Sequence, residues 1–161
     1  MSLPAVFIFS ALLLRMVSAA PPPSHAKPSD LPLALSDMSS KSYFGFVILL
    51  DMLNDTTKAT LAQDVTFFVP SDQHLAEIPI SPARLEEFIL SHGIPDPMQF
   101  NELARLPTGT VFPSCMNSRM LRISTKGRLV FVNNAQIIAP NVCSSSTIKC
   151  HGIDAVIANY G

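Results

Sequence analysis

The sequence predicts an α+β domain in which helices surround one buried strand and a β-rich half follows. Three observations predict this class. Val65–Val69 is a short run of β-branched and aromatic residues, which is typical of a buried strand. Longer segments with helical spacing precede and follow that run, whereas from Thr110 onward the apolar residues tend to alternate. A second apolar segment, Lys149–Ile157, is expected to be the partner strand of the first.

The first part of the chain is expected to lie outside this domain. Leu3–Leu14 is almost wholly apolar and small residues follow, so residues 1–20 are typical of a secretory signal peptide. An uncleaved anchor is less favoured, because about a dozen apolar residues are fewer than the roughly 20 that span a bilayer. Residues 21–32 are rich in Pro and Ser and predict a linker, which leaves residues 33–161 as a single domain. We expect no membrane span, and no GPI anchor because the last residues lack a hydrophobic tail.

Three helices are predicted around the central strand. Ser42–Asn54 is too long for a typical strand and apolar around nearly its whole circumference, which predicts a buried helix that ends at Asn54. Ala83–Leu90 follows a Ser-Pro pair that is typical of a helix start. A third, short helix is expected after Asp96, which with Gln99 approximates a capping box.

The central strand is expected to end at Pro70, because proline has no N–H to donate to a sheet. Ser71 and Asp72 are then expected to cap one helical turn through Leu75, since their side-chain oxygens can accept its unpaired N–H groups.

The second half of the sequence predicts strands. Arg119–Ser124 and Leu129–Asn133 flank a four-residue turn and predict a β-hairpin. Asn134–Pro140 predicts another strand that proline closes, and Thr147–Ala158 predicts one or two more, bent at Gly152.

The cysteines and one tripeptide are candidates for covalent modification. Three cysteines leave one thiol over if two of them pair. We favour Cys143–Cys150, which flank a loop between neighbouring strands, and pairing of Cys115 with either of them stays an alternative. Asn54 begins an Asn-Asp-Thr sequon and is a candidate glycosylation site.

No familiar catalytic or cofactor motif is present. The sequence contains no HExxH, CxxC, P-loop or GxGxxG pattern, so we expect no metal and no cofactor. A secreted hydrolase using His92 or His151 is one alternative, although no GxSxG elbow accompanies these histidines. A carrier of a small apolar ligand is another, and it would need a pocket of at least about 300 Å³.

Charge is unevenly distributed along the chain. Residues 21–104 hold eleven acidic and four basic side chains, whereas residues 105–161 hold six basic and one acidic. Such asymmetry can mark a surface for an anionic partner, and solvated strand faces are the simpler interpretation. The candidate patch consists of Arg119, Arg122, Lys126 and Arg128. Nucleic acid is not expected, because only Phe131 accompanies these cations for base stacking.

Five motifs, in order along the chain, resemble the fasciclin or FAS1 domain. Thr66–Asp72 resembles its first signature, a strand followed by Pro, Ser or Thr, and Asp or Asn, and Cys150–Ile157 resembles its second, usually V-H-x-I-D-x-V-L. Between them, Leu90–His92 falls where the family has Tyr-His, and Leu106–Gly109 and Val132–Ile137 fit its L-P-T and V-N-x-A-x-I positions. The residues that carry the resemblance and are expected to hold the domain together are Thr66, Phe67, Pro70, Ser71, Asp72, His92, Asn133, His151, Gly152, Ile153 and Asp154.

The resemblance implies a FAS1-like β-sandwich or wedge of about seven strands with several helices packed on it. It implies no catalytic chemistry and no cofactor. It suggests a secreted, extracellular glycoprotein of the cell wall or matrix, similar to plant fasciclin-like arabinogalactan proteins, which would lie in the wall or apoplast of a plant. The partners it implies are wall or matrix polysaccharides and matrix proteins, and an acidic polysaccharide would suit the candidate basic patch.

Overall fold

The computed structural model describes residues 29–158. The predicted signal peptide (1–20) and residues 21–28 of the predicted linker lie outside this part, as do residues 159–161. The strands are β1 (Val65–Pro70), β2 (Gly93–Ile94), β3 (Thr110–Pro113), β4 (Met120–Lys126), β5 (Leu129–Val132), β6 (Ala135–Ala139) and β7 (Ile148–Ile153). The helices are α1 (Leu31–Ser40), α2 (Phe44–Asp51), α3 (Asp55–Thr60), α4 (Asp72–Ala76), the 3-10 helix η1 (Pro82–Arg84), α5 (Leu85–Ser91) and α6 (Phe100–Leu103).

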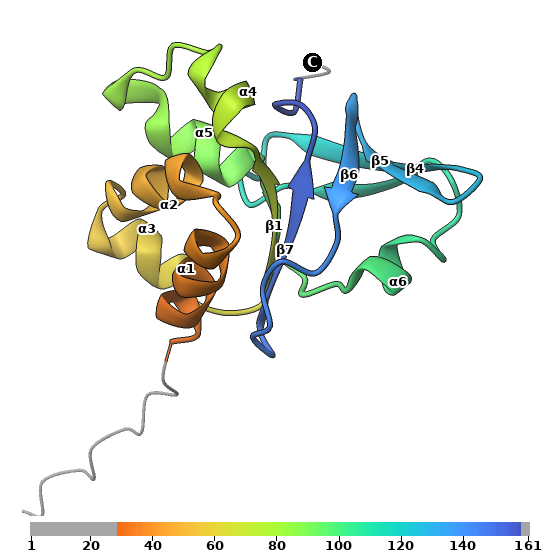
Figure 1. The fold of residues 1–161 in the computed structure, drawn as a ribbon, viewed down its shortest axis with the longest axis horizontal. Coiled ribbons are helices and arrows are strands. Elements are labelled where there is room, and N and C mark those ends of the chain that lie inside the picture. The colour runs from red at the N-terminus through yellow and green to blue at the C-terminus, as the bar shows by residue number, and fades with distance from the viewer. Residues whose placement is uncertain (1–28, 159–161) are drawn as a thin grey trace, which may run out of the picture.

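The seven strands of the described residues form one mixed sheet in the order β2-β1-β7-β6-β5-β4-β3. Helices α1 to α5 gather on one side of the β1–β7 pair, and the β4–β5 hairpin with α6 extends on the other side (Figure 1). The predicted α+β fold with about seven strands is confirmed. The hairpin and the strand before Pro140 are also confirmed, as β4–β5 and β6.

The β1–β7 pair lies at the centre of the molecule. β1 runs parallel to β7, with Phe67 opposite Cys150 and Pro70 opposite Ile153, so the predicted pairing of the two segments is confirmed. Phe67 packs into a core formed with α1, α2 and α5, whereas its neighbour Phe68 packs into a second core under the hairpin and α6. Successive side chains of a strand point to opposite faces, which is why one strand contributes to both cores.

The first predicted helix differs from the structure in length and in burial. The segment predicted as one helix, Ser42–Asn54, is interrupted: α2 ends at Asp51, and a separate helix, α3, begins at Asp55. Asn54 therefore does not end a helix but is the N-cap residue of α3, where its side-chain Oδ1 accepts the N–H of Thr57 at 2.8 Å. The prediction that this helix is buried on all sides was also wrong, because one face of α2 is exposed to solvent.

Three predictions about how helices begin differ from the structure. α1 begins at Leu31, inside the stretch predicted as linker. Ser71 is the N-cap residue of α4, but its hydroxyl lies 2.7 Å from Nδ1 of His74 rather than on a backbone N–H. The capping box of α6 uses Gln99 and Glu102 instead of Asp96 and Gln99, with the Gln99 N–H donating to Glu102 at 2.6 Å.

Candidate functional site

His92 ends α5 and is almost completely buried. The N–H of Ile157 donates to its Nε2 at 3.1 Å, so Nδ1 carries the proton and donates to the carbonyl of Phe88 at 2.8 Å. Burial lowers the pKa of His92 to about 4, and the positive charge of Arg119 adds to this effect, while the bond to Phe88 opposes it. The ring is therefore neutral near pH 7 and joins α5 to the segment after β7.

His151 lies in β7 and plays a similar part on the other side of the sheet. The N–H of Asn141 donates to its Nδ1 at 3.1 Å, and its Nε2 donates to the carbonyl of Met98 at 2.9 Å. Burial lowers the pKa of His151 as well. Both nitrogens of each histidine are thus occupied by backbone groups, which leaves neither ring with a nitrogen for proton transfer to a substrate.

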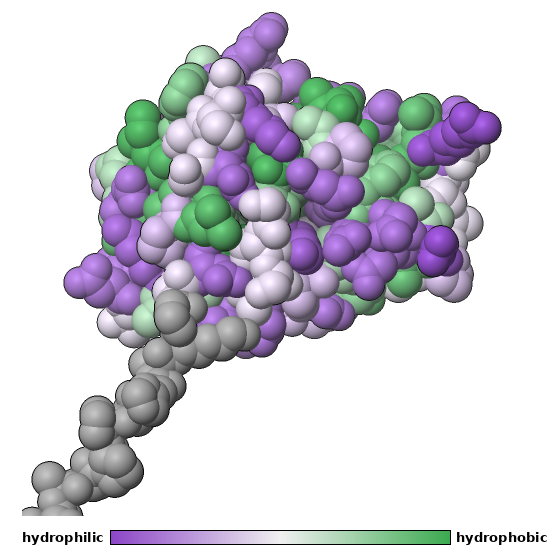
Figure 2. Space-filling view, turned by 60° about the horizontal axis from the view of Figure 1, so that its bottom comes forward, coloured by the Kyte–Doolittle hydropathy of each residue, from purple (hydrophilic) through white to green (hydrophobic). Residues whose placement is uncertain are grey.

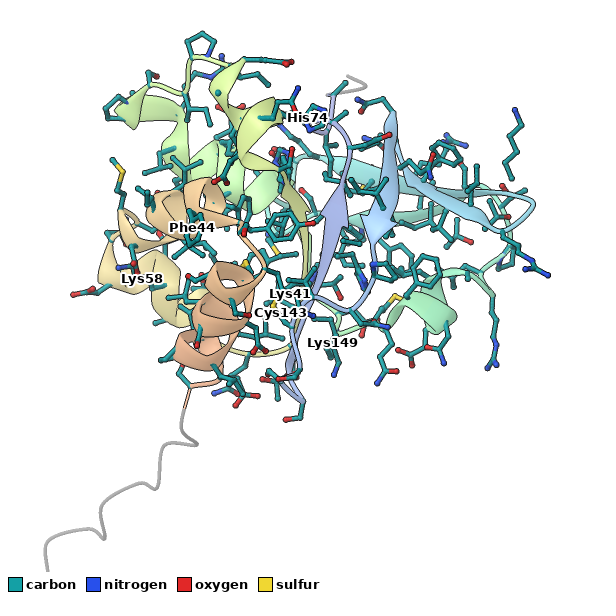
Figure 3. The ribbon with its side chains drawn as sticks, in the orientation of Figure 1. Lys41, Phe44, Lys58, His74, Cys143 and Lys149 are labelled. Atoms are coloured by element: carbon teal, nitrogen blue, oxygen red, sulfur yellow. A yellow bond between two sulfur atoms is a disulfide. The ribbon has the colours of Figure 1, made fainter. Side chains whose placement is uncertain are left out.

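Two serines lie near imidazoles, and neither makes a convincing nucleophile. Ser91 Oγ is 3.3 Å from Nδ1 of His92, but its hydroxyl donates to the carbonyl of Phe88, which also accepts from that nitrogen. Ser71 Oγ is 2.7 Å from Nδ1 of His74, which lies on α4 near the surface (Figure 3). The neighbouring carboxylate, Asp72, accepts the N–H of Gly45 in α2 at 2.8 Å and so does not orient His74 as the acid of a catalytic triad would.

The other motif residues connect loops to the central strands. Thr66 Oγ1 donates to the carbonyl of Asp96 at 2.6 Å and accepts the N–H of Met98 at 2.7 Å. Asp154 Oδ1 accepts the N–H of Gln136 at 2.8 Å. Asn133, with a positive φ of 53°, accepts the N–H of Arg122 at 2.8 Å in the turn after β5. These bonds fix the loops around the sheet and supply no exposed chemistry.

Gly152 is required by a close approach between β7 and Tyr43. A Cβ added at this position would lie 1.9 Å from the hydroxyl oxygen of Tyr43 and 2.8 Å from the Cβ of Ala139. Both distances are far below a normal van der Waals contact, so only glycine fits without a rearrangement.

One small pocket and one open groove with apolar walls lie beside the helices. The pocket, of about 150 Å³, lies over His92 and is lined by Phe88, Ile157 and the ion pair of Arg119 with Glu87. It is smaller than the roughly 300–1,000 Å³ of typical small-molecule sites. A groove of about 460 Å³ lies between α2 and α4, but it is open along its length and would leave a bound ligand largely in water.

The structure brings three of the four predicted cations together. Arg122 and Lys126 are exposed on the same face of β4, and Arg128 is exposed in the turn that follows. Arg119 instead precedes β4, is mostly buried, and pairs with Glu87 beside the small pocket. We call Arg122, Lys126 and Arg128 the hairpin cations.

A comparison with protein-family models matches residues 44–159 to the fasciclin domain. The chain belongs to the fasciclin domain family. This is a family known for cell adhesion and extracellular binding, and the resemblance drawn from the five motifs is confirmed. Helix α1 lies before the matched range.

Among solved structures, the fasciclin domain of this chain is similar to a FAS1 domain pair from the insect cell adhesion molecule Fasciclin I. The TM-score is 0.62 at 15% sequence identity, over 74% of this chain. The chain covers 46% of that domain pair, and at this identity the similarity shows the fold alone. No curated protein sequence gives a significant match.

The disulfide and the free thiol of this fasciclin domain follow the favoured prediction. Cys143 and Cys150 are bonded, with their Cα atoms 5.0 Å apart. Burial raises the pKa of the Cys115 thiol to about 11, so it is a weak nucleophile at neutral pH. Within residues 29–158, no cluster of His, Cys, Asp and Glu side chains has the arrangement of a metal site. None of the helices in that range combines the length and apolarity that crossing a bilayer requires.

Sequence reasoning missed the contacts that hold α1 on the fasciclin domain. Asp30 accepts hydrogen bonds from the hydroxyls of Ser145 and Thr147, each at 2.7 Å, and these bonds lower the pKa of Asp30 to about 2. Asp37 accepts from both the N–H and the hydroxyl of Ser144 at 2.7 Å. Figure 3 shows Cys143 beside this junction of α1 with the loop before β7. The run of hydroxyl side chains between the two bonded cysteines was the available signal, but its acceptors lie more than a hundred residues earlier.

Proposed function

We propose that this fasciclin domain is a secreted, non-catalytic module of the extracellular matrix or cell wall that binds an acidic polysaccharide through the hairpin cations. The observation that carries the proposal is the exposure of Arg122, Lys126 and Arg128 on one hairpin of the basic half of the molecule. Pectin-like polyuronates, which carry one carboxylate on each acidic sugar, have the matching chemistry.

The arrangement of the hairpin supports a polymer as the ligand. Arg122 and Lys126 are four residues apart on one strand, which places them about 13 Å apart along β4. Regularly spaced anions on an extended chain can meet such cations one after another. Each exposed contact contributes little by itself, since exposed ion pairs are worth about 0–1 kcal/mol, so binding would depend on several contacts made together.

The state of the buried histidines supports a binding role over the hydrolase alternative. A general base must reach the proton that it abstracts, and the nitrogens of His92 and His151 are engaged by backbone groups. The disulfide Cys143–Cys150 is consistent with an oxidising, extracellular compartment. The exposed sequon at Asn54 is consistent with a glycoprotein.

The proposal is tested by retention on immobilised polygalacturonate. We expect the wild-type chain to be retained near neutral pH and released by salt, because salt screens exposed charges. Changing Arg122, Lys126 and Arg128 to Ala should abolish retention. A matched control changes Lys41, Lys58 and Arg84 to Ala, which removes the same charge from the helical side and should leave retention unchanged. Retention that salt does not affect, or equal loss in both triple variants, would contradict the proposal.

A further inference from the structure

Large apolar side chains are exposed on two separate faces of the molecule. On the helical side they belong mainly to α2, and on the other side mainly to the outer face of the β3–β4–β5 strands, with Ile138 of β6 also exposed. Figure 2 shows apolar surface over both sides, with polar side chains between them. Contiguous exposed apolar surface in a soluble protein commonly marks an interaction site.

The apolar face on the helical side lies along α2 and is called the α2 ridge, and its Phe44 and Ile48 also form one wall of the open groove between α2 and α4. Phe44, Ile48 and Met52 are 52%, 58% and 59% exposed, and their spacing of four residues places them in one stripe along α2. Phe44 lies at the start of this stripe (Figure 3). Asp51 lies beside Ile48 and Met52, and Asp55 follows. The Lys58 ammonium also lies at this end, where it donates to the carbonyl of Asp51 at 2.6 Å, so two carboxylates and one ammonium leave the C-terminal end of the ridge with a net negative charge. A helix that is apolar around its whole circumference is normally covered on all sides, yet this face of α2 is open.

The strand face is a hollow of complementary character. Val111 and Met120 are 40% and 51% exposed on neighbouring strands, and with Arg122 and Asn133 they line a depression of about 380 Å³. Lys126 follows on the same face of β4. The hollow therefore offers apolar walls with a basic rim.

The two sides of the molecule also differ in net charge: the helical side is acidic and the strand side is basic. Residues 29–91, which form α1 to α5 and β1, carry nine acidic and three basic side chains. Residues 92–158, which form β2 to β7 and α6, carry six basic and three acidic side chains. The chain is thus electrically bipolar, and opposite ends of two copies attract each other while like ends repel.

We propose that the chain self-associates head to tail, with the α2 ridge of one copy (Phe44, Ile48 and Met52, with Asp51) seated in the strand hollow of the next (Val111, Met120, Arg122 and Asn133). Apolar side chains meet apolar walls, and the acidic end of the ridge meets Arg122 and Lys126. The two surfaces of one such contact differ, so a pair of copies still has one open ridge and one open hollow. The contact can therefore repeat along an open chain of molecules instead of closing a dimer. An acidic polysaccharide on the hairpin cations would compete with the incoming ridge.

The test uses sedimentation velocity of the full chain without added glycan, from about 1 µM to about 1 mM, the range of weak protein contacts. Two variants each block one face: Ile48→Glu in the ridge and Met120→Glu in the hollow. Both replaced side chains are more than half exposed, so the fold should tolerate them, and unchanged melting temperatures confirm this. Leu33→Glu is the control, because it adds the same charge at an exposed position of α1 outside both faces.

We expect the sedimentation coefficient of the wild type and of Leu33→Glu to rise with concentration and to fall back in high salt. Each blocked variant alone should stay monomeric. An equimolar mixture of the two blocked variants should form dimers and nothing larger, because one open ridge then meets one open hollow. A wild type that stays monomeric throughout, a mixture that stays monomeric, or a Leu33→Glu variant that fails to associate would overturn the proposal.

Discussion

The β1–β7 pair and the β4–β5 hairpin are each built from neighbouring strands of one sheet, yet the two pairs differ in how far their side chains are buried. Every residue of β1 is buried, as are all residues of β7 except Lys149, which is half-buried. In β4, buried Leu121 and Ile123 alternate with exposed Met120 and Arg122. The pair is enclosed by two cores, whereas the hairpin has only one face covered.

This difference separates what holds the fold from what can meet a partner. The residues of both fasciclin signatures lie on or next to the β1–β7 pair. The side chains of Thr66, His151 and Asp154 are hydrogen-bonded to backbone atoms. The hairpin carries the exposed cations and apolar side chains. Family membership is therefore recognised from the central pair, while any binding specificity must come from surfaces that the signatures do not describe.

The largest contrast should appear when one phenylalanine is removed from each region. Phe67 in β1 is fully buried and meets Phe46 edge to face at 6.0 Å, so Phe67→Ala should lower the free energy of unfolding by about 3–5 kcal/mol. Phe131 in β5 is only partly buried on the outer face, and Phe131→Ala should cost less than about half as much. Denaturant unfolding measures both. Equal losses would mean that the central pair is not the main core.

Acid should destabilise the fold through its two buried histidines. His92 has its pKa lowered to about 4, against about 6.5 in an unfolded chain, so between these pH values the unfolded state binds more protons than the folded one. Stability is therefore fully present above pH 6.5 and falls as the pH drops toward 4, by on the order of 3 kcal/mol for this group. His151 acts in the same direction.

This acid effect can be followed by melting temperature and by NMR titration of each imidazole. We expect the melting temperature to fall steadily from pH 7 to pH 4, while the resonances of His92 keep their neutral shifts down to about pH 5. Protonation of His92 near pH 6.5 with no loss of stability would contradict the buried, backbone-bonded state.

Local patterns sufficed for elements whose signal is contained in a few residues. The strand before Pro70, the hairpin around Gly127 and the disulfide across a short loop could all be predicted from spacing and residue type. The exposed face of α2 could not be predicted, because the sequence of an apolar segment does not show which side of the helix other elements will cover. Asp72 shows the same limit: its position suggested a cap for α4, but its carboxylate binds Gly45, far back along the chain.

The candidate site was predictable only in part, for a similar reason. Arg122, Lys126 and Arg128 follow each other along one hairpin, so their grouping is visible in the sequence. Arg119 precedes the same strand but forms an ion pair with Glu87 on α5, a partner that no local pattern indicates. The ridge and the hollow likewise combine residues whose exposure depends on the packing of the whole domain.

The central claim is that the buried signature strands hold the fold while the exposed hairpin binds. NMR titration of the isotope-labelled chain with a short oligogalacturonate tests it most directly. We expect the chemical-shift changes to concentrate at Arg122 and Lys126–Arg128, and we expect the amides around His92 and His151 to be unchanged. Shift changes centred on the pocket over His92, or on α2 and α4 without the hairpin, would contradict it.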